Sequence, residues 1–229
     1  MKKRMMIMSA KSSYRCFQLK VMGIIALALP VVAILLVMVI HGLPAPESIS
    51  QTATIADKSD FLLPLSLGAL ALFSLTYSLK YAYNDKLERI LTKLMCGGFL
   101  LVAVQKCFSD YLVADRIGLF YLTPEWSHIV HSIGAIIGFG SMILWIMLCF
   151  TKSDKPKKEQ TTRKHLRNSI YYWLGWGMVA SLGIFVFDII GFFGTDFPVV
   201  FVVEWAMLGF GGIACIIKSG AILPDKEEK

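Results

Sequence analysis

The sequence predicts an all-α protein: a polytopic integral membrane protein built as a six-transmembrane-helix bundle with both termini in the cytoplasm. Its composition points to a membrane, because 56% of the 229 residues are hydrophobic and only 17% are charged, whereas a soluble domain carries about 25% charged residues. The apolar residues also gather in six runs, each close to the ~20 residues that cross a bilayer as a helix. We therefore expect a basic cytoplasmic N-terminal segment (1–20), a transmembrane domain (21–219) and a cytoplasmic tail (220–229).

The first two runs are 21–43 and 61–83. The apolar stretch of the first, Val21 to Ile40, exceeds the 7–15 residues of a typical signal-peptide core. The "HGLPAPES" that follows it has no small-x-small cleavage motif. We therefore interpret the first run as a helix that is retained in the protein.

The third run, 88–108, is the least apolar, because Lys93 and Lys106 flank a short apolar core. It is kept as a span because six spans, unlike five, make the basic loops alternate correctly across the membrane. The last three runs, 126–150, 169–193 and 198–219, are each long enough to cross a bilayer.

The distribution of basic residues predicts the orientation. Of the 23 Lys and Arg residues, 20 lie in the N-terminal segment, in 80–93, in 152–167 and at the C-terminal end; the other three are Lys58, Lys106 and Arg116. By the positive-inside rule both termini are cytoplasmic. This placement accounts for the net charge of +7 without a nucleic-acid partner. The "MKKR" start favours a bacterial inner (plasma) membrane.

Seven ionisable residues from five of the expected helices share the outer half of the bundle, whereas the inner halves are nearly bare of them. These residues are His41, Lys106, Asp110, His128, His131, Asp188 and Glu204. Ionisable residues in lipid face the bundle interior and pair with one another. We therefore expect a polar cavity that opens towards the non-cytoplasmic side.

Three chemistries compete for this cluster. A metal site would use His128 and His131, at i and i+3, with Asp188 and Glu204 as further zinc ligands; the bound zinc would activate water for hydrolysis of an outer-leaflet lipid. A proton- or ion-coupled transporter is a second alternative, although no charged residue marks the cytoplasmic half of a route. The interpretation we favour is a lipid-binding cleft or structural network in which Glu204 contacts His131 or Lys106.

Small residues predict which helices pack closely. They lie on one face of the fourth, fifth and sixth expected helices, together with the polar residues of each. The three faces are His131, Gly134 and Gly138; Gly177, Ser181 and Asp188; and Glu204, Leu208 and Gly211. Such faces let helix backbones approach, so we expect the fourth, fifth and sixth helices to meet along them.

Three segments resemble a family of six-span membrane proteins. They are "ISQT" (49–52), "HSIGAIIGFG" (131–140) and "EWAMLGFGG" (204–212). They are similar to motifs of the family that includes the damage-regulated autophagy modulators and the lipid-remodelling protein that acts after GPI attachment. Gln51 departs from the aspartate of that family, Pro46 is displaced by one position, and the third span keeps only a trace around Gln105. A related bacterial group of six-span proteins fits equally well.

The resemblance implies a lipid-associated membrane protein, and it points to His131 and Glu204 rather than to His128 or Asp188. Our expectation is a protein that recognises or handles a membrane lipid from the outer-leaflet side, as a non-catalytic or accessory factor. The expected partners are membrane lipids, with a partner membrane protein or a second copy of the chain in addition. No cofactor is expected unless the zinc alternative holds.

Overall fold

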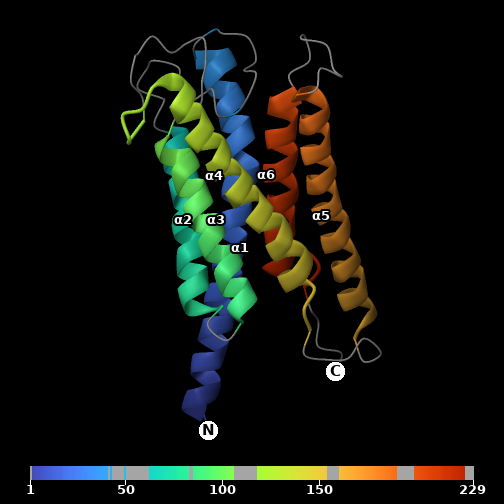
Figure 1. Ribbon diagram of the computed structural model, residues 1–229. Helices are drawn as coiled ribbons and strands as arrows, with labels where there is room; N and C mark the ends of the chain where they lie inside the picture. Colours follow the sequence, from blue (N-terminus) through green and yellow to red (C-terminus); the bar gives the residue numbers. More distant parts are fainter. Residues whose placement is uncertain are drawn as a thin grey trace.

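The computed structural model describes residues 2–40, 42, 49, 62–82, 85–105, 118–153, 160–189 and 199–224. Within these residues the fold is all-helical and contains no strand (Figure 1). The helices are α1 (Lys2–Ile34) with its π-helical continuation η1 (Leu35–Ile40), α2 (Leu62–Lys80), α3 (Lys86–Val104), α4 (Pro124–Leu144) with its π-helical continuation η3 (Trp145–Phe150), α5 (Thr162–Ile189) and α6 (Val199–Lys218). The all-α prediction is confirmed for this part of the chain.

Two helices begin earlier than the sequence predicts. Helix α1 runs from Lys2 through the basic segment that we had set apart from the first span, since no Gly or Pro precedes Gly23 to interrupt it. Helix α5 begins at Thr162, seven residues before the expected start at 169. Its first two turns are rich in basic residues, and Arg167 within them is buried. The basic loop is therefore partly helix packed on the bundle.

Successive helices run in alternating directions, so the start of α1 and the end of α6 lie at the same end of the bundle (Figure 1). We call this end, which also carries Asp85 and Lys152, the basic end. Helix α3 packs against α2 and α4, and helix α6 packs against α1 and α5. The opposite end carries Gln105, Thr123 and Val199, which cap or begin their helices.

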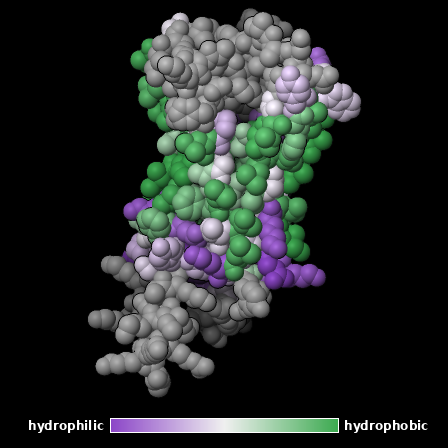
Figure 2. All heavy atoms as spheres, turned by 90° about the vertical axis from the view of Figure 1, so that its left-hand side faces the viewer, coloured by the Kyte–Doolittle hydropathy of each residue, from purple (hydrophilic) through white to green (hydrophobic). Residues whose placement is uncertain are grey.

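Among the residues that the structure describes, three helices are long and apolar enough to cross a membrane: Ser13–Val32, Pro124–Phe150 and Val199–Lys218. Their outward faces, and those of neighbouring helices, expose large apolar side chains such as Leu65, Leu72 and Ile136. Figure 2 shows apolar residues covering the middle of one face, with hydrophilic residues gathered towards the basic end. Water would not solvate so wide an apolar belt favourably, whereas lipid chains would. These helices indicate a membrane-embedded protein.

The glycine faces pack differently from the prediction. Gly134 and Gly138 of α4 lie against Gly98 of α3, where a Cβ on Gly98 would lie 2.6 Å from the Cα of Gly138 and 2.7 Å from the carbonyl oxygen of Gly134. The prediction that this face meets the fifth and sixth helices is therefore wrong. The physical reason is that Gly98 also lacks a side chain, so that the two backbones can touch.

The other two faces follow the prediction more closely. Gly177 of α5 packs against the ring of Phe210 on α6, and Gly211 of α6 packs against Met142 of α4. Helix α6 thus touches both α4 and α5 through these faces.

We expect Gly98→Ala to lower the free energy of unfolding of the detergent-solubilised protein by about 1–3 kcal/mol, because the new methyl group would overlap the backbone of α4. The effect is measured as a lower melting temperature. The matched control is Gly97→Ala, at the next position, where a Cβ meets nothing within 4 Å. That change should be neutral or slightly stabilising, since alanine favours helix. Equal melting shifts for the two variants would contradict the close α3–α4 contact.

Candidate functional site

A cavity lies between α1, α2, α3, α4 and α6, towards the end of the bundle opposite the basic end. Eight apolar side chains and two ionisable ones line it: Leu29, Ile49, Leu67, Phe99, Val102, Ala135, Phe139 and Leu208, with His131 and Glu204. The space open to the centre of a water molecule is ≈ 20 Å³, which is enough for about one water. Two residues that the sequence predicted as site residues thus share one small, mainly apolar cavity.

Glu204 faces this cavity from α6 and binds the segment between α1 and α2. Its Oε2 accepts a hydrogen bond of 2.5 Å from the backbone N–H of Ile49. Ile49 is buried, with 2% of its surface exposed, and it also lines the cavity. A hydrogen bond from a backbone amide to a carboxylate is charge-assisted and stronger than a neutral one. Glu204 therefore holds Ile49 over the cavity.

His131 is fixed by the end of α3. Its ring is buried, and Nδ1 lies 2.7 Å from the backbone carbonyl oxygen of Gln105. Because a carbonyl oxygen can only accept, Nδ1 carries the proton, and in the neutral ring Nε2 is an acceptor. His131 and Glu204 are thus oriented by Gln105 and Ile49, two backbone partners that the sequence did not reveal.

Gln105 joins α3, α4 and the 118–121 turn. Its fully buried side chain donates from Nε2 to Ser127 Oγ at 3.0 Å and accepts at Oε1 from Phe120 N at 3.2 Å. Gly118 has φ +74°, and a Cβ there would lie 2.5 Å from Gln105 Oε1. The sequence showed Gln105 only as a trace of the family pattern. In the sequence, Gln105 could have been identified as a side-chain amide at the end of an apolar run, followed by the turn residue Gly118.

Of the other predicted site residues, none that the structure describes lines this cavity. His128 is exposed on α4. Asp188 lies in the last turn of α5, but its side chain is not among those that the structure describes. His41, Lys106 and Asp110 lie outside the described residues. Within the described part, no three His, Cys, Asp or Glu side chains are placed to hold a metal ion. The four-ligand zinc site includes Asp188 and so stays a prediction.

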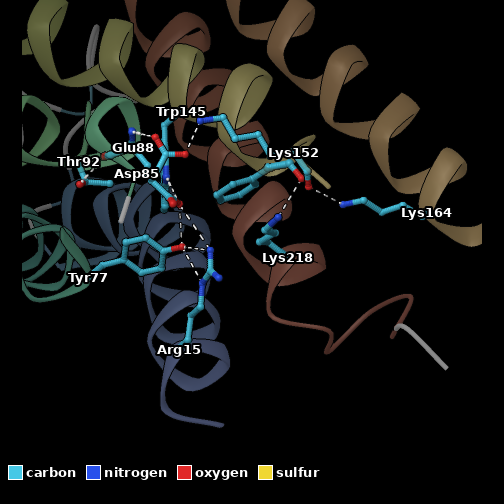
Figure 3. Close-up of polar contacts among 10 residues, drawn as sticks. Arg15, Tyr77, Asp85, Glu88, Thr92, Trp145, Lys152, Lys164 and Lys218 are labelled. Carbon is cyan, nitrogen blue, oxygen red and sulfur yellow. Dashed lines mark hydrogen bonds and ion pairs between the residues drawn. The ribbon is translucent and has the colours of Figure 1, made fainter. Parts of the chain in front are cut away.

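The basic end holds a second polar cluster that the sequence did not predict. Glu88, in the first turn of α3, is 7% exposed. Its Oε1 accepts hydrogen bonds from Tyr77 Oη at 3.0 Å and Trp145 Nε1 at 3.1 Å (Figure 3). Arg15 donates from Nε to Tyr77 Oη at 2.8 Å and lies 3.6 Å from Glu88 Oε1. Glu88 begins the expected third span and Arg15 lies in the segment expected to precede the first, so this cluster lies at the margin of the expected spans.

This cluster joins four helical segments. The Arg15 guanidinium donates to the Tyr77 hydroxyl, which donates in turn to the Glu88 carboxylate, so α1, α2 and α3 share one hydrogen-bonded chain. Trp145 adds η3 to it. The signal in the sequence is the D-x-x-E pattern of Asp85 and Glu88, which is typical of a helix start. Asp85 does cap α3, accepting from Glu88 N at 3.1 Å.

Asp85 also pairs with Lys152, in the segment after η3. The hydrogen bond from Lys152 holds the pKa of the Asp85 carboxyl below its usual range, and the same contact raises the pKa of Lys152. Both side chains are partly exposed, so the stabilisation is below about 1 kcal/mol.

The pair predicts an acid-dependent loss of stability. Because the pKa of Asp85 is lowered by folding, its contribution is complete above the ordinary value of 3.8 and is lost as the pH falls through the lower folded value. Asp85→Asn keeps a capping side chain but removes the charge. We expect its melting temperature to fall less steeply than that of the wild type on acidification through this range. If the melting temperatures of the two proteins fall in parallel as the pH is lowered, the Asp85–Lys152 pair contributes nothing to stability.

Comparisons with protein families, with curated proteins and with solved structures find no match for this chain. The family resemblance of the three sequence motifs therefore stays a prediction.

Proposed function

We propose that this chain crosses a membrane six times with both termini on the cytoplasmic side, and that it recognises or handles a membrane lipid at the opposite end as a non-catalytic or accessory factor. The alternating helix directions and the gathering of basic residues at one end support this orientation. The basic end is then cytoplasmic, and the cavity lies on the outer-leaflet side.

The observation that carries the lipid proposal is the composition of the cavity. Its walls are apolar, and its two ionisable side chains are His131 and Glu204. A mainly apolar site with a few placed polar groups is typical of a pocket for an amphipathic ligand. The Glu204 carboxylate accepts hydrogen bonds, so it would select a headgroup that donates them, such as an amine or a hydroxyl.

The cavity is too small for such a ligand unless a residue that lines it moves. A space for about one water does not hold a headgroup. Displacement of Ile49 would enlarge the cavity and release Glu204 from the Ile49 amide. A headgroup donor would then replace this amide as the partner of the carboxylate. The resemblance of 49–52, 131–140 and 204–212 to a lipid-associated family agrees with this use of Ile49, His131 and Glu204.

The test is native mass spectrometry of the full-length protein, released from mild detergent without chelators. We expect the wild type to retain phospholipid and the two cavity variants to retain less. Glu204→Gln removes the negative charge and one acceptor oxygen, and His131→Ala removes the ring. The control is Glu125→Gln, an exposed carboxylate in the first turn of α4, which should retain as much as the wild type.

The alternatives give different outcomes in the same measurement. Equal lipid retention and equal stability in all four proteins would remove the support for a lipid site. A stoichiometric metal adduct that is lost in both cavity variants would favour the zinc-dependent hydrolase instead. The transporter alternative requires gradient-dependent uptake of a solute into liposomes, a readout that is independent of lipid retention.

A further inference from the structure

The two ionisable side chains of the cavity between α1, α2, α3, α4 and α6, which we call the outer-end cavity, both offer hydrogen-bond acceptors. An ionised carboxylate can only accept, and Glu204 Oε2 accepts from the backbone N–H of Ile49. The Nδ1 atom of His131 faces Gln105, which does not line the cavity, so the rest of the ring, with the acceptor Nε2, is the part that can reach it. The other described lining side chains are apolar. A polar group that enters this cavity therefore has to donate hydrogen bonds.

This pair of acceptors distinguishes among the polar groups that membrane lipids carry. A hydroxyl has one donor, so it cannot donate to Glu204 and His131 at the same time. A primary ammonium has three donors, and its hydrogen bond to a carboxylate is charge-assisted from both sides. A trimethylammonium has the positive charge but no N–H to donate. Of these groups, the primary ammonium therefore matches the two acceptors best.

The size of the outer-end cavity favours the same group. The space open to the centre of a water molecule is ≈ 20 Å³, which is enough for about one water, and the –NH₃⁺ tip of an amine resembles a water molecule in size. A trimethylammonium is larger by its methyl groups and would need more space. The cavity can therefore take an –NH₃⁺ tip, whereas the rest of the headgroup needs the displacement of Ile49 described above.

The hydrogen bond between Glu204 and Ile49 shows where an ammonium would bind. The backbone N–H of Ile49 already acts as a donor to the carboxylate, at 2.5 Å. An ammonium that replaced this neutral amide would add a full positive charge, and its attraction to the carboxylate would be stronger between apolar walls than in water. Because the ammonium takes the position of an existing donor, the site does not depend on a carboxylate that lacks partners.

We infer, on the basis of the proposed lipid function, that the outer-end cavity binds the primary ammonium group of an aminophospholipid, of which phosphatidylethanolamine is the simplest. Glu204 would be the counter-ion of the ammonium, and His131 Nε2 would accept a second hydrogen bond from it. A lipid is favoured over a soluble amine because the cavity has apolar walls and lies between membrane-embedded helices.

The test titrates phosphatidylethanolamine, its N-monomethyl and N,N-dimethyl derivatives and phosphatidylcholine, all with the same acyl chains, into the delipidated full-length protein. Native mass spectrometry measures the binding of each. Every added methyl group removes an N–H donor, while the positive charge and the phosphate stay. We expect binding to weaken along this series, and phosphatidylethanolamine to bind at least about tenfold more tightly than phosphatidylcholine, because one hydrogen bond to a charged group corresponds to about that factor.

Glu204→Gln tests whether the carboxylate is responsible for this preference. The change removes the counter-ion but keeps an acceptor of similar size. We expect the ratio of phosphatidylethanolamine to phosphatidylcholine affinity to fall about threefold or more, because a charge-assisted hydrogen bond is roughly twice as strong as a neutral one. The matched control is Glu125→Gln, an exposed carboxylate at the same end of the bundle, which should leave the ratio unchanged. If Glu204→Gln does not fold, the methylation series on the wild type decides alone.

The outcomes separate this ammonium site from the proposed lipid function. If the wild type binds phosphatidylethanolamine and phosphatidylcholine equally, the ammonium site is wrong but the lipid function stands. If the wild type binds none of the lipids, both fail. An unchanged affinity ratio in Glu204→Gln would overturn the ammonium site by placing the preference elsewhere on the protein. Displacement of phosphatidylethanolamine by equimolar phosphoethanolamine would overturn the lipid as its ligand, since it would indicate a site for a soluble amine.

Discussion

Glu88→Ala is expected to destabilise the protein by about 3–5 kcal/mol, because removing one member of a buried charged cluster leaves the others without compensation. Tyr77 and Trp145 would lose the carboxylate that accepts their hydrogen bonds, and Arg15 would lose its anion. Unfolding of the detergent-solubilised protein by heat or by denaturant measures the effect.

Two further variants separate charge from hydrogen bonding at this site. Glu88→Gln keeps an oxygen that can accept from Tyr77 and Trp145 but removes the negative charge, so it should fall between wild type and Glu88→Ala. Tyr77→Phe removes only the hydroxyl between Arg15 and Glu88. Its effect should not add to that of Glu88→Ala, because both changes break the same chain of contacts. Full additivity would show that the two residues act separately.

Gln105→Ala is expected to cost about 2–4 kcal/mol, because it leaves the Phe120 amide and the Ser127 hydroxyl without the contacts they make to this side chain. The 118–121 turn and α4 are both held through this side chain. The variant should also lower the retention of lipid at the outer-end cavity. Gln105 does not line that cavity, and alanine keeps the backbone carbonyl that His131 contacts. Loss of the side-chain contacts to Phe120 and Ser127 would let this carbonyl shift, and His131 with it.

Gln18→Ala is the control for Gln105→Ala, since Gln18 is the same residue type and is also buried. Gln18 makes one side-chain hydrogen bond, from Nε2 to Thr76 Oγ1 at 2.8 Å, and its Oε1 has no hydrogen-bond partner within the described residues. Its removal should therefore cost less and should leave lipid retention unchanged. If the two variants are equally stable, Gln105 does not have the organising role that its contacts indicate.

The fold class and, within a few residues, most helix boundaries follow from the amino-acid sequence alone. Runs of about twenty apolar residues have few alternatives to a helix, because unpaired backbone groups cannot be left in lipid. The expected span 61–83 accordingly corresponds to α2 (Leu62–Lys80), 126–150 to α4 with η3, and 198–219 to α6 (Val199–Lys218). The six-span topology rests on the loop charges and stays a prediction.

The pairing of His131 and Glu204 in one cavity was also within reach of the sequence. A His and a Glu inside apolar helices have to face protein rather than lipid. Depth along each helix then places them at the same level. Their partners were not predictable, because Ile49 and Gln105 contribute backbone atoms whose positions depend on how the chain turns between helices.

Which helices meet, and which charged side chains are buried, depends on how distant segments pack. The Gly134–Gly138 face could have served any neighbour with a small residue, and it was Gly98 of α3 that met it. Arg15 and Glu88 lie 73 positions apart, and in the sequence each resembles a solvated residue at a helix end. Tyr77 and Trp145 bury Glu88 and link it to the partly exposed Arg15, because hydrogen-bond geometry between distant segments is set by packing and not by local pattern.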